Sequence, residues 1–249
     1  EMCIRDRYVT GSLKDVTFEV FALEDVKSAD GESEDYYKKD ELVATITTDD
    51  TGIAKLSGLP LGKYYVKEKA TVDGFVLDNE AREIDLTYRD QDTAEVTYSA
   101  DWQNNRQKAE VEVVKKEKDS DRVLEGAVFA LCAKNDITGA DGKVILEADT
   151  VIEELATDKE GKLTFTADLP IGFEYYIKET SPAPGFATTD ETQEFTFEYE
   201  GAEKEKVFYS FTFEDEPTVI EITKTSLTDG KELEGAKLQV TDESGKVVD

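Results

Sequence analysis

Residues 169–186 read LPIGFEYYIKETSPAPGF, and this stretch decides the fold because the chain repeats it. A weaker copy, LPLGKYYVKEKATVDGF, occupies residues 59–75, and each copy follows a Thr-Asp turn that contains a glycine. Glu68 and Glu179 mark equivalent places in the two copies and lie 111 residues apart. A repeat of this length indicates tandem domains, since the repeats of solenoid proteins are only about 20–45 residues long.

A second motif sets the boundaries of the repeats. LEGAVFAL at residues 124–131 recurs as LEGAKLQV at 233–240 and more weakly as LKDVTFEV at 13–20. We therefore divide the chain into an N-terminal block at residues 12–108, a complete central block at 109–218 and the start of a truncated C-terminal block at 219–249.

The residue pattern inside each block predicts strands. Val111 and Val113 alternate with Glu112, and Tyr175 and Ile177 alternate in the same way with their neighbours. Alternation with a period of two, bounded by Gly, Pro, Asp and Asn, is typical of half-buried antiparallel strands. No capped amphipathic helix is evident, so the sequence predicts an all-β fold of tandem β-sandwich domains.

The composition excludes several classes of function. The 249 residues include 58 acidic and 29 basic side chains, a net charge of −29, which disfavours binding to nucleic acids or to anionic membranes. There is no histidine, so every histidine-based catalytic or metal site is excluded. We expect no cofactor and no metal, and we interpret the acidic stretch at residues 30–35 as a solvated loop because it lacks the spacing of a calcium loop.

The first residues look foreign to the protein. Met2–Arg7 reads MCIRDR and resembles a translated sequencing adapter, although a polar N-terminal strand is the alternative. We predict that residues 1–11 derive from such an adapter and leave them out of the fold prediction. Cys3 would then be spurious, and Cys132 would be the one natural cysteine.

Three elements of the central block together resemble a known family. They are the strand that contains Lys115, the LEGAVF motif at 124–129 and YYIKETSPAPGF at 175–186. They are similar to the collagen-adhesin B-type domain, which is the prealbumin-like domain of SpaA-type pilins and adhesins of Gram-positive bacteria. The resemblance covers essentially everything after residue 11, but the N-terminal block departs from it with KATVD at 69–73 in place of TSPAP at 180–184.

The resemblance implies a seven-stranded, immunoglobulin-like or prealbumin-like sandwich in an extracellular, cell-wall-attached protein. Such domains serve as stalk or pilus-shaft segments and are not enzymes. The partners implied are neighbouring domains of the same surface protein, and sortase and the cell wall through a further C-terminal region. Two alternatives stay open: a module that binds host extracellular matrix or glycan, and an accessory domain of a secreted enzyme.

Many members of this family form a spontaneous isopeptide bond between a lysine and an asparagine or aspartate, assisted by a buried carboxylic acid. The resemblance assigns these roles in the central block to Lys115, to Asp215 as the acceptor and to Glu179 as the helper. Lys115 lies 12 residues before Ala127 in the sequence and shares a strand face with Val113, which turns it toward the core.

The other blocks carry the same site in incomplete form. In the N-terminal block, Glu68 is the predicted helper and Asn104 the predicted acceptor, with Asn105 as the runner-up. Its lysine is missing, because the position 12 residues before Val16 is Ile4.

The C-terminal block keeps Lys224, 12 residues before Ala236, and its helper and acceptor are expected beyond Asp249. Two simpler interpretations of the central site also remain: a buried lysine–carboxylate cluster with no covalent bond, or three side chains in water at strand ends.

Overall fold

The structure is a computed structural model. It describes residues 13–28, 34–90, 92, 95–139, 142–219 and, apart from 229, 232, 233, 236, 238 and 242, residues 221–247. The described residues form thirteen strands and no helix, which confirms the predicted all-β fold. No described helix is therefore available to cross a bilayer. The predicted adapter segment, residues 1–11, lies outside the described residues.

The chain divides into two compact units, residues 1–216 and residues 217–249. The larger unit contains the N-terminal and central blocks, and all thirteen strands of the described residues belong to it.

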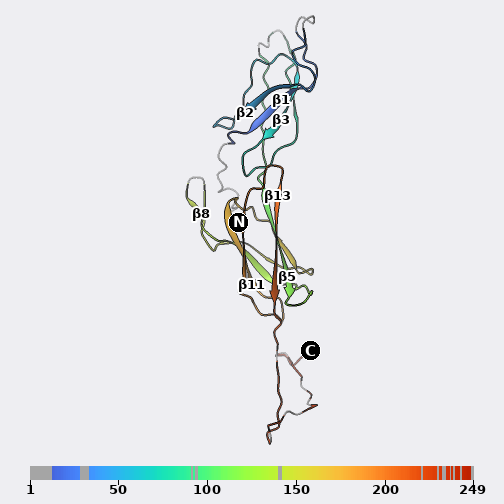
Figure 1. Ribbon diagram of the computed structural model, residues 1–249, viewed down its shortest axis with the longest axis vertical. Helices are drawn as coiled ribbons and strands as arrows, with labels where there is room; N and C mark the ends of the chain where they lie inside the picture. The colour runs from blue at the N-terminus through green and yellow to red at the C-terminus, as the bar shows by residue number, and fades with distance from the viewer. Residues whose placement is uncertain are drawn as a thin grey trace. The chain divides into compact units, whose positions relative to one another are not determined.

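Four antiparallel strands form one sheet in the N-terminal block, in the order β2-β1-β3-β4 (Figure 1). The strands are β1 (Thr17–Ala22), β2 (Leu42–Thr47), β3 (Lys63–Ala70) and β4 (Arg82–Asp85). Every second residue of β1 is buried, as the period of two predicts for a sheet with one face on a core.

The central block is a sandwich of two sheets. The smaller sheet has the order β10-β5-β13 and consists of β5 (Lys108–Glu117), β10 (Lys162–Phe165) and β13 (Lys206–Asp215). The larger has the order β12-β11-β6-β9 and consists of β6 (Val128–Ala133), β9 (Val151–Ala156), β11 (Phe173–Ser181) and β12 (Thr192–Phe197). These are the seven strands expected, and Val113, Phe129, Ile177 and Phe213 from both sheets meet in one core.

A short hairpin lies in the connection between β6 and β9. It pairs β7 (Ile137–Thr138) with β8 (Val144–Leu146). The Gly139 N–H donates to Lys143 O at 2.9 Å and holds the two strands together near their turn. The hairpin was missed because its strands are too short to show an alternation of their own.

The first and last strands of the central block lie side by side and run parallel (Figure 1). Val111 lies opposite Tyr209, and Lys115 lies opposite Phe213. A parallel pair needs a long crossover connection. Here the whole intervening block provides it, so residues from the two ends of the block become neighbours.

The turn at residues 157–161 packs against β5 and requires its glycine. Gly161 has a φ of +67°, and a Cβ added there would lie 2.6 Å from Val123 Cβ and 2.8 Å from Lys115 O. Lys115 N–H donates to Gly161 O at 2.8 Å, and Leu124 N–H donates to Lys115 O at 3.0 Å. The backbone of Lys115 is therefore held on both sides.

We predict that Gly161→Ala destabilises the central block by more than Gly172→Ala does. Both glycines have positive φ, for which a side chain costs about 1–2 kcal/mol, but a Cβ at Gly172 would meet no atom within 4 Å. Hydrogen exchange of β5 peptides in the full chain measures the difference. Equal protection in the two variants would contradict the close approach.

Candidate functional site

Lys115 is a fully buried lysine. It lies on the inward face of β5, in line with Val111 and Val113, and its side chain is 0% exposed. A lysine is almost never buried to this degree without a partner. Its neighbours must therefore provide compensating charge.

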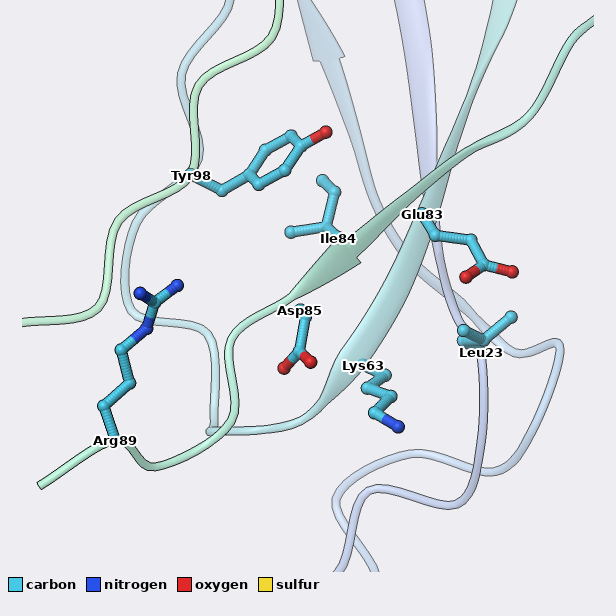
Figure 2. Close-up of a pocket in the computed structure, with 7 residues that line it drawn as sticks. All are labelled: Leu23, Lys63, Glu83, Ile84, Asp85, Arg89 and Tyr98. Carbon is cyan, nitrogen blue, oxygen red and sulfur yellow. The ribbon is translucent and has the colours of Figure 1, made fainter.

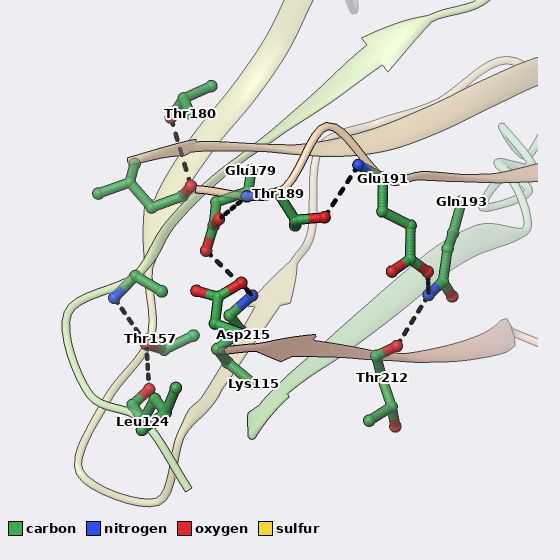
Figure 3. Close-up of polar contacts among 12 residues, drawn as sticks. Lys115, Leu124, Thr157, Glu179, Thr180, Thr189, Glu191, Gln193, Thr212 and Asp215 are labelled. Carbon is green, nitrogen blue, oxygen red and sulfur yellow. Dashed lines mark hydrogen bonds and ion pairs between the residues drawn. The ribbon is translucent and has the colours of Figure 1, made fainter. Parts of the chain in front are cut away.

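Two carboxylates from other strands supply that charge (Figure 3). Lys115 Nζ lies 2.5 Å from Asp215 Oδ1 and 3.1 Å from Glu179 Oε1, and both carboxylates are also 0% exposed at the side chain. Lys115 comes from β5, Glu179 from β11 and Asp215 from the end of β13. The structure thus brings together the three side chains that the resemblance assigned to the central site.

Glu179 is held in a way that favours its neutral form. Burial raises the pKa of the Glu179 carboxyl above its usual value, and the charge of Asp215 adds to this effect. The Thr189 N–H, which donates to Glu179 Oε2 at 3.1 Å, and Lys115 both act in the opposite direction. Burial is the largest of these contributions, so the pKa of Glu179 is raised and its neutral form is favoured relative to a carboxyl in water.

The surroundings of the three groups are apolar. The Phe129 ring lies 5.5 Å from Lys115 Nζ, and it packs against Phe213 with ring centroids 4.9 Å apart. Removing an ion from water costs several kcal/mol, which an ion pair recovers only with good geometry and full hydrogen bonding. Asp215 Oδ2 is buried and has no hydrogen-bond partner among the described residues, so the recovery here is incomplete.

Thr157 holds the backbone of the LEGA motif next to Lys115, and it was not predicted as a functional residue. Its hydroxyl donates to Leu124 O at 2.7 Å and accepts from Ala127 N–H at 3.1 Å. It thereby joins the Thr-Asp turn to the LEGA motif next to Lys115. The signal was in the sequence, because Thr48 occupies the same turn of the N-terminal block and makes the same kind of bond to Leu13 O at 2.5 Å.

The N-terminal block holds a helper–acceptor pair without a lysine. Asn104 Nδ2 donates to Glu68 Oε2 at 2.6 Å and to Val76 O at 3.0 Å. Glu68 is buried, whereas Asn105, the runner-up, is exposed and engages Val76 through its backbone carbonyl. Ile4, the position counted for the lysine, lies outside the described residues.

The lysine of the C-terminal block is exposed. Lys224 belongs to the smaller unit, and the three residues before it form no strand. Cys132, by contrast, is a free and buried residue of β6 in the central block.

Comparison with known proteins finds one family. The model of the SpaA prealbumin-like fold domain matches twice, at residues 6–102 and 109–210. No curated protein matches the chain.

Several solved structures are similar. The TIE protein of Bacillus anthracis is 27% identical with a TM-score of 0.54; the match covers 96% of this chain and 38% of that protein. The shaft pilin SpaA of Lactobacillus rhamnosus GG is 18% identical with a TM-score of 0.35, covering 84% of this chain and 90% of the pilin. The minor pilin GBS52 of Streptococcus agalactiae is 17% identical with a TM-score of 0.34, covering 86% and 87%.

We predict a pH dependence of stability that belongs to Glu179. In Lys115→Met, which removes the buried cation, burial still raises the Glu179 pKa above its unfolded value near 4.5. Since the folded state then binds the proton more tightly, this contribution is fully present below pH 4.5 and is lost as the pH rises through the folded pKa.

Urea unfolding of Lys115→Met between pH 4 and pH 8 measures this loss, with hydrogen exchange of β11 peptides as the readout. Each unit of pKa difference corresponds to about 1.4 kcal/mol. The matched control is Lys115→Met combined with Glu179→Gln, which should lack this part of the slope. Identical slopes in both variants would contradict the assignment.

Proposed function

The chain belongs to the family of SpaA prealbumin-like fold domains, and on this premise we propose that it is a stalk segment of a Gram-positive surface protein or pilin whose central block is closed by an isopeptide bond between Lys115 and Asp215. The observation that carries the proposal is the set of three fully buried, contacting side chains in that block.

The chemistry begins with a neutral amine. A proton passes from Lys115 to the Asp215 carboxylate, which the contact of 2.5 Å permits and which removes both charges from the apolar core. The Lys115 Nζ lone pair then attacks Asp215 Cγ. Neutral Glu179 donates its proton as a hydrogen bond to the acceptor oxygen and stabilises the negative charge that develops there.

The products balance as one amide and one water. The C–N bond forms, one Asp215 oxygen leaves as water, and Glu179 returns to its starting protonation state. The leaving oxygen is Asp215 Oδ1, which has received the Lys115 proton and takes the second proton that the amine loses as it becomes an amide. The folded core supplies the effective concentration by holding the reacting atoms in contact.

The bond also fits a stalk mechanically. Tension from the preceding block enters β5 at Lys108, and tension from the following block enters β13 after Asp215. A bond between Lys115 and Asp215 transmits this force directly and bypasses the sequence between them. In the cross-link entropy model, a loop of 100 residues adds about 4–5 kcal/mol to stability.

We predict an intact mass about 18 Da below the sequence mass, which corresponds to one water lost in amide formation at an activated nucleophile. Denaturing mass spectrometry of the full chain measures it. Lys115→Arg, which keeps the positive charge but cannot condense in this way, should show its full sequence mass, and Glu179→Ala should do so while remaining folded. An unmodified mass for the folded, aged wild-type chain would refute the bond.

We further predict that the central block resists extension in single-molecule pulling. With the bond in place, the 100 residues between Lys115 and Asp215 cannot lengthen. Lys115→Arg should release about 330–360 Å of additional contour length, at 3.3–3.6 Å per residue. A wild-type chain that shows the same additional length as the variant would contradict a covalent bond that carries the tension.

A further inference from the structure

The N-terminal and central blocks are joined at Gln107, a glutamine with almost no access to water. Gln107 is 1% exposed and directly precedes β5, where the chain passes from one block to the next. Both blocks belong to the same compact unit of the structure. Glutamine is mostly exposed in proteins, and a buried one needs partners for its two N–H donors and its carbonyl oxygen. The partners of Gln107 therefore show how the two blocks are connected.

One loop of the central block supplies the partners of the Gln107 amide. This loop, residues 198–205 between β12 and β13, is the clasp loop. Gln107 Nε2 donates to Gly201 O at 3.0 Å and to Lys204 O at 2.8 Å. Glu200 N–H donates to Gln107 Oε1 at 2.9 Å. Both donors and the acceptor of the amide are thus used, and a fully satisfied buried group of this kind favours a single arrangement.

The backbone at the link is held by both blocks. Gln107 N–H donates to Gly74 O of the N-terminal block at 3.0 Å. The next residue, Lys108, donates its N–H to Glu205 O of the clasp loop, also at 3.0 Å. Successive residues of the link therefore bond to opposite blocks. A link whose backbone is fixed in this way does not behave as a flexible spacer.

The clasp loop also contacts the N-terminal block directly. The contacted segment is the anchor loop, residues 72–78, which follows β3. The Tyr199 hydroxyl donates to Phe75 O at 3.0 Å, and Leu77 N–H donates to Ala202 O at 2.9 Å. The first of these contacts joins residues that are 124 positions apart in the sequence. The two blocks are therefore connected by more than the covalent link.

An ion pair and an apolar contact lie at the same joint. The guanidinium of Arg106 pairs with the carboxylate of Asp168 in the central block, and both side chains are mostly buried. Arg106 also forms a β-bridge with Phe75 of the anchor loop. A Cβ added at Gly74 would lie 3.7 Å from Ile171 Cδ1, so the anchor loop is within van der Waals reach of the central block. Charged, polar and apolar groups thus all contribute to the joint.

The anchor loop also holds the Glu68–Asn104 pair of the N-terminal block. Val76 O accepts from Asn104 Nδ2 at 3.0 Å, and Asp78 N–H donates to Glu68 Oε2 at 2.7 Å. Leu77, which bonds to the central block, lies between these two residues in the sequence. Three consecutive residues therefore connect the joint to the buried pair.

A hollow elsewhere in the N-terminal block is separate from this joint. Its volume is about 430 Å³, and Figure 2 shows the residues that line it: Leu23, Lys63, Glu83, Ile84, Asp85, Arg89 and Tyr98. Lys63 is the first residue of β3, whereas the anchor loop follows the last residue of that strand. Tyr98 is therefore a tyrosine of the same block that lies away from the joint.

We propose that the clasp loop, held by Gln107, fixes the N-terminal block on the central block, so that the two blocks move as one stiff segment. Relative motion is the usual behaviour of two linked domains unless the contacts between them oppose it. Here the bonds run through the link, the clasp loop and the anchor loop at once. Rotation at the joint would leave buried polar groups without partners, which costs free energy. In a stalk, such a joint would resist bending between the blocks.

The test measures motion between the two blocks in the full chain. Cys3→Ser and Cys132→Ala remove the native thiols. Spin labels are then attached to cysteines introduced by Thr45→Cys on β2 and Phe208→Cys on β13, which are both exposed positions. Double electron–electron resonance measures the distribution of distances between the labels, and its width reports how far the blocks move relative to one another.

Gln107→Glu tests the clasp loop with little change in shape. It replaces the two N–H donors of the side chain with a carboxylate oxygen that faces Gly201 O and Lys204 O. We expect a single narrow distribution in the labelled chain without this substitution and a broader one in Gln107→Glu. The matched control is Gln103→Glu, which makes the same change of charge at an exposed glutamine and should leave the width unchanged.

A milder pair of variants keeps the test valid if Gln107→Glu does not fold. Tyr199→Phe removes only the hydroxyl that contacts Phe75 O, and Tyr98→Phe makes the same change beside the hollow. The first should broaden the distribution and the second should not. Hydrogen exchange of β11 peptides shows whether the central block stays folded. Peptides of the anchor loop should exchange about tenfold faster in Gln107→Glu, since a buried group has lost its partner.

Two results would overturn the inference. A distribution in the labelled chain as broad as that of Gln107→Glu would show that the blocks already move freely. A distribution that stays narrow in both Gln107→Glu and Tyr199→Phe would show that the clasp loop does not hold the joint. Neither result bears on the proposed isopeptide bond, because both residues lie outside its site and intact mass tests that bond separately.

Discussion

The central block is organised around one ammonium group that has no access to water. Lys115 sits in the core among Val113, Phe129 and Phe213, where an ion is stable only against opposite charge. Two carboxylates meet that requirement, and each must come from a different strand. The sandwich therefore has one arrangement in which β5, β11 and β13 all fit, and a shift of register by one residue would move the charges to the wrong face.

The parallel pairing of β5 and β13 brings these charged residues together from distant parts of the sequence. Lys115 and Asp215 are 100 residues apart in sequence, and the pairing of the first strand with the last brings them into contact. The turn at Thr157–Gly161 fixes the backbone of Lys115 from the other side. A covalent bond at this place would convert a non-local contact, which is the slowest kind to form, into a permanent one.

The local part of this arrangement could be predicted from the sequence. Strand parity places Lys115 inward, and the resemblance to SpaA-type domains assigned Glu179 and Asp215 to the helper and acceptor positions, so the three could be named before their contact was known. Asn104 and Asn105 could not be told apart as firmly, because the choice depends on which amide meets Glu68 across the sheet.

The non-local part could not be predicted. The Thr189 contact with Glu179 comes from a loop with no alternation, and the β7–β8 hairpin is too short to leave a pattern. Alternation along the chain predicts on which face of a strand a side chain lies. The residues that this side chain contacts depend on segments that are distant in the sequence.

Because Asp215 lies at the end of the last strand of the central block, it is the last of the three site residues to be made. Synthesis proceeds from the N-terminus, so Lys115 and Glu179 leave the ribosome before the residue that completes the site. Until the ten residues of β13, Lys206–Asp215, have been made, the proposed acceptor is absent. The proposed bond would therefore close only after nearly the whole central block has been synthesised.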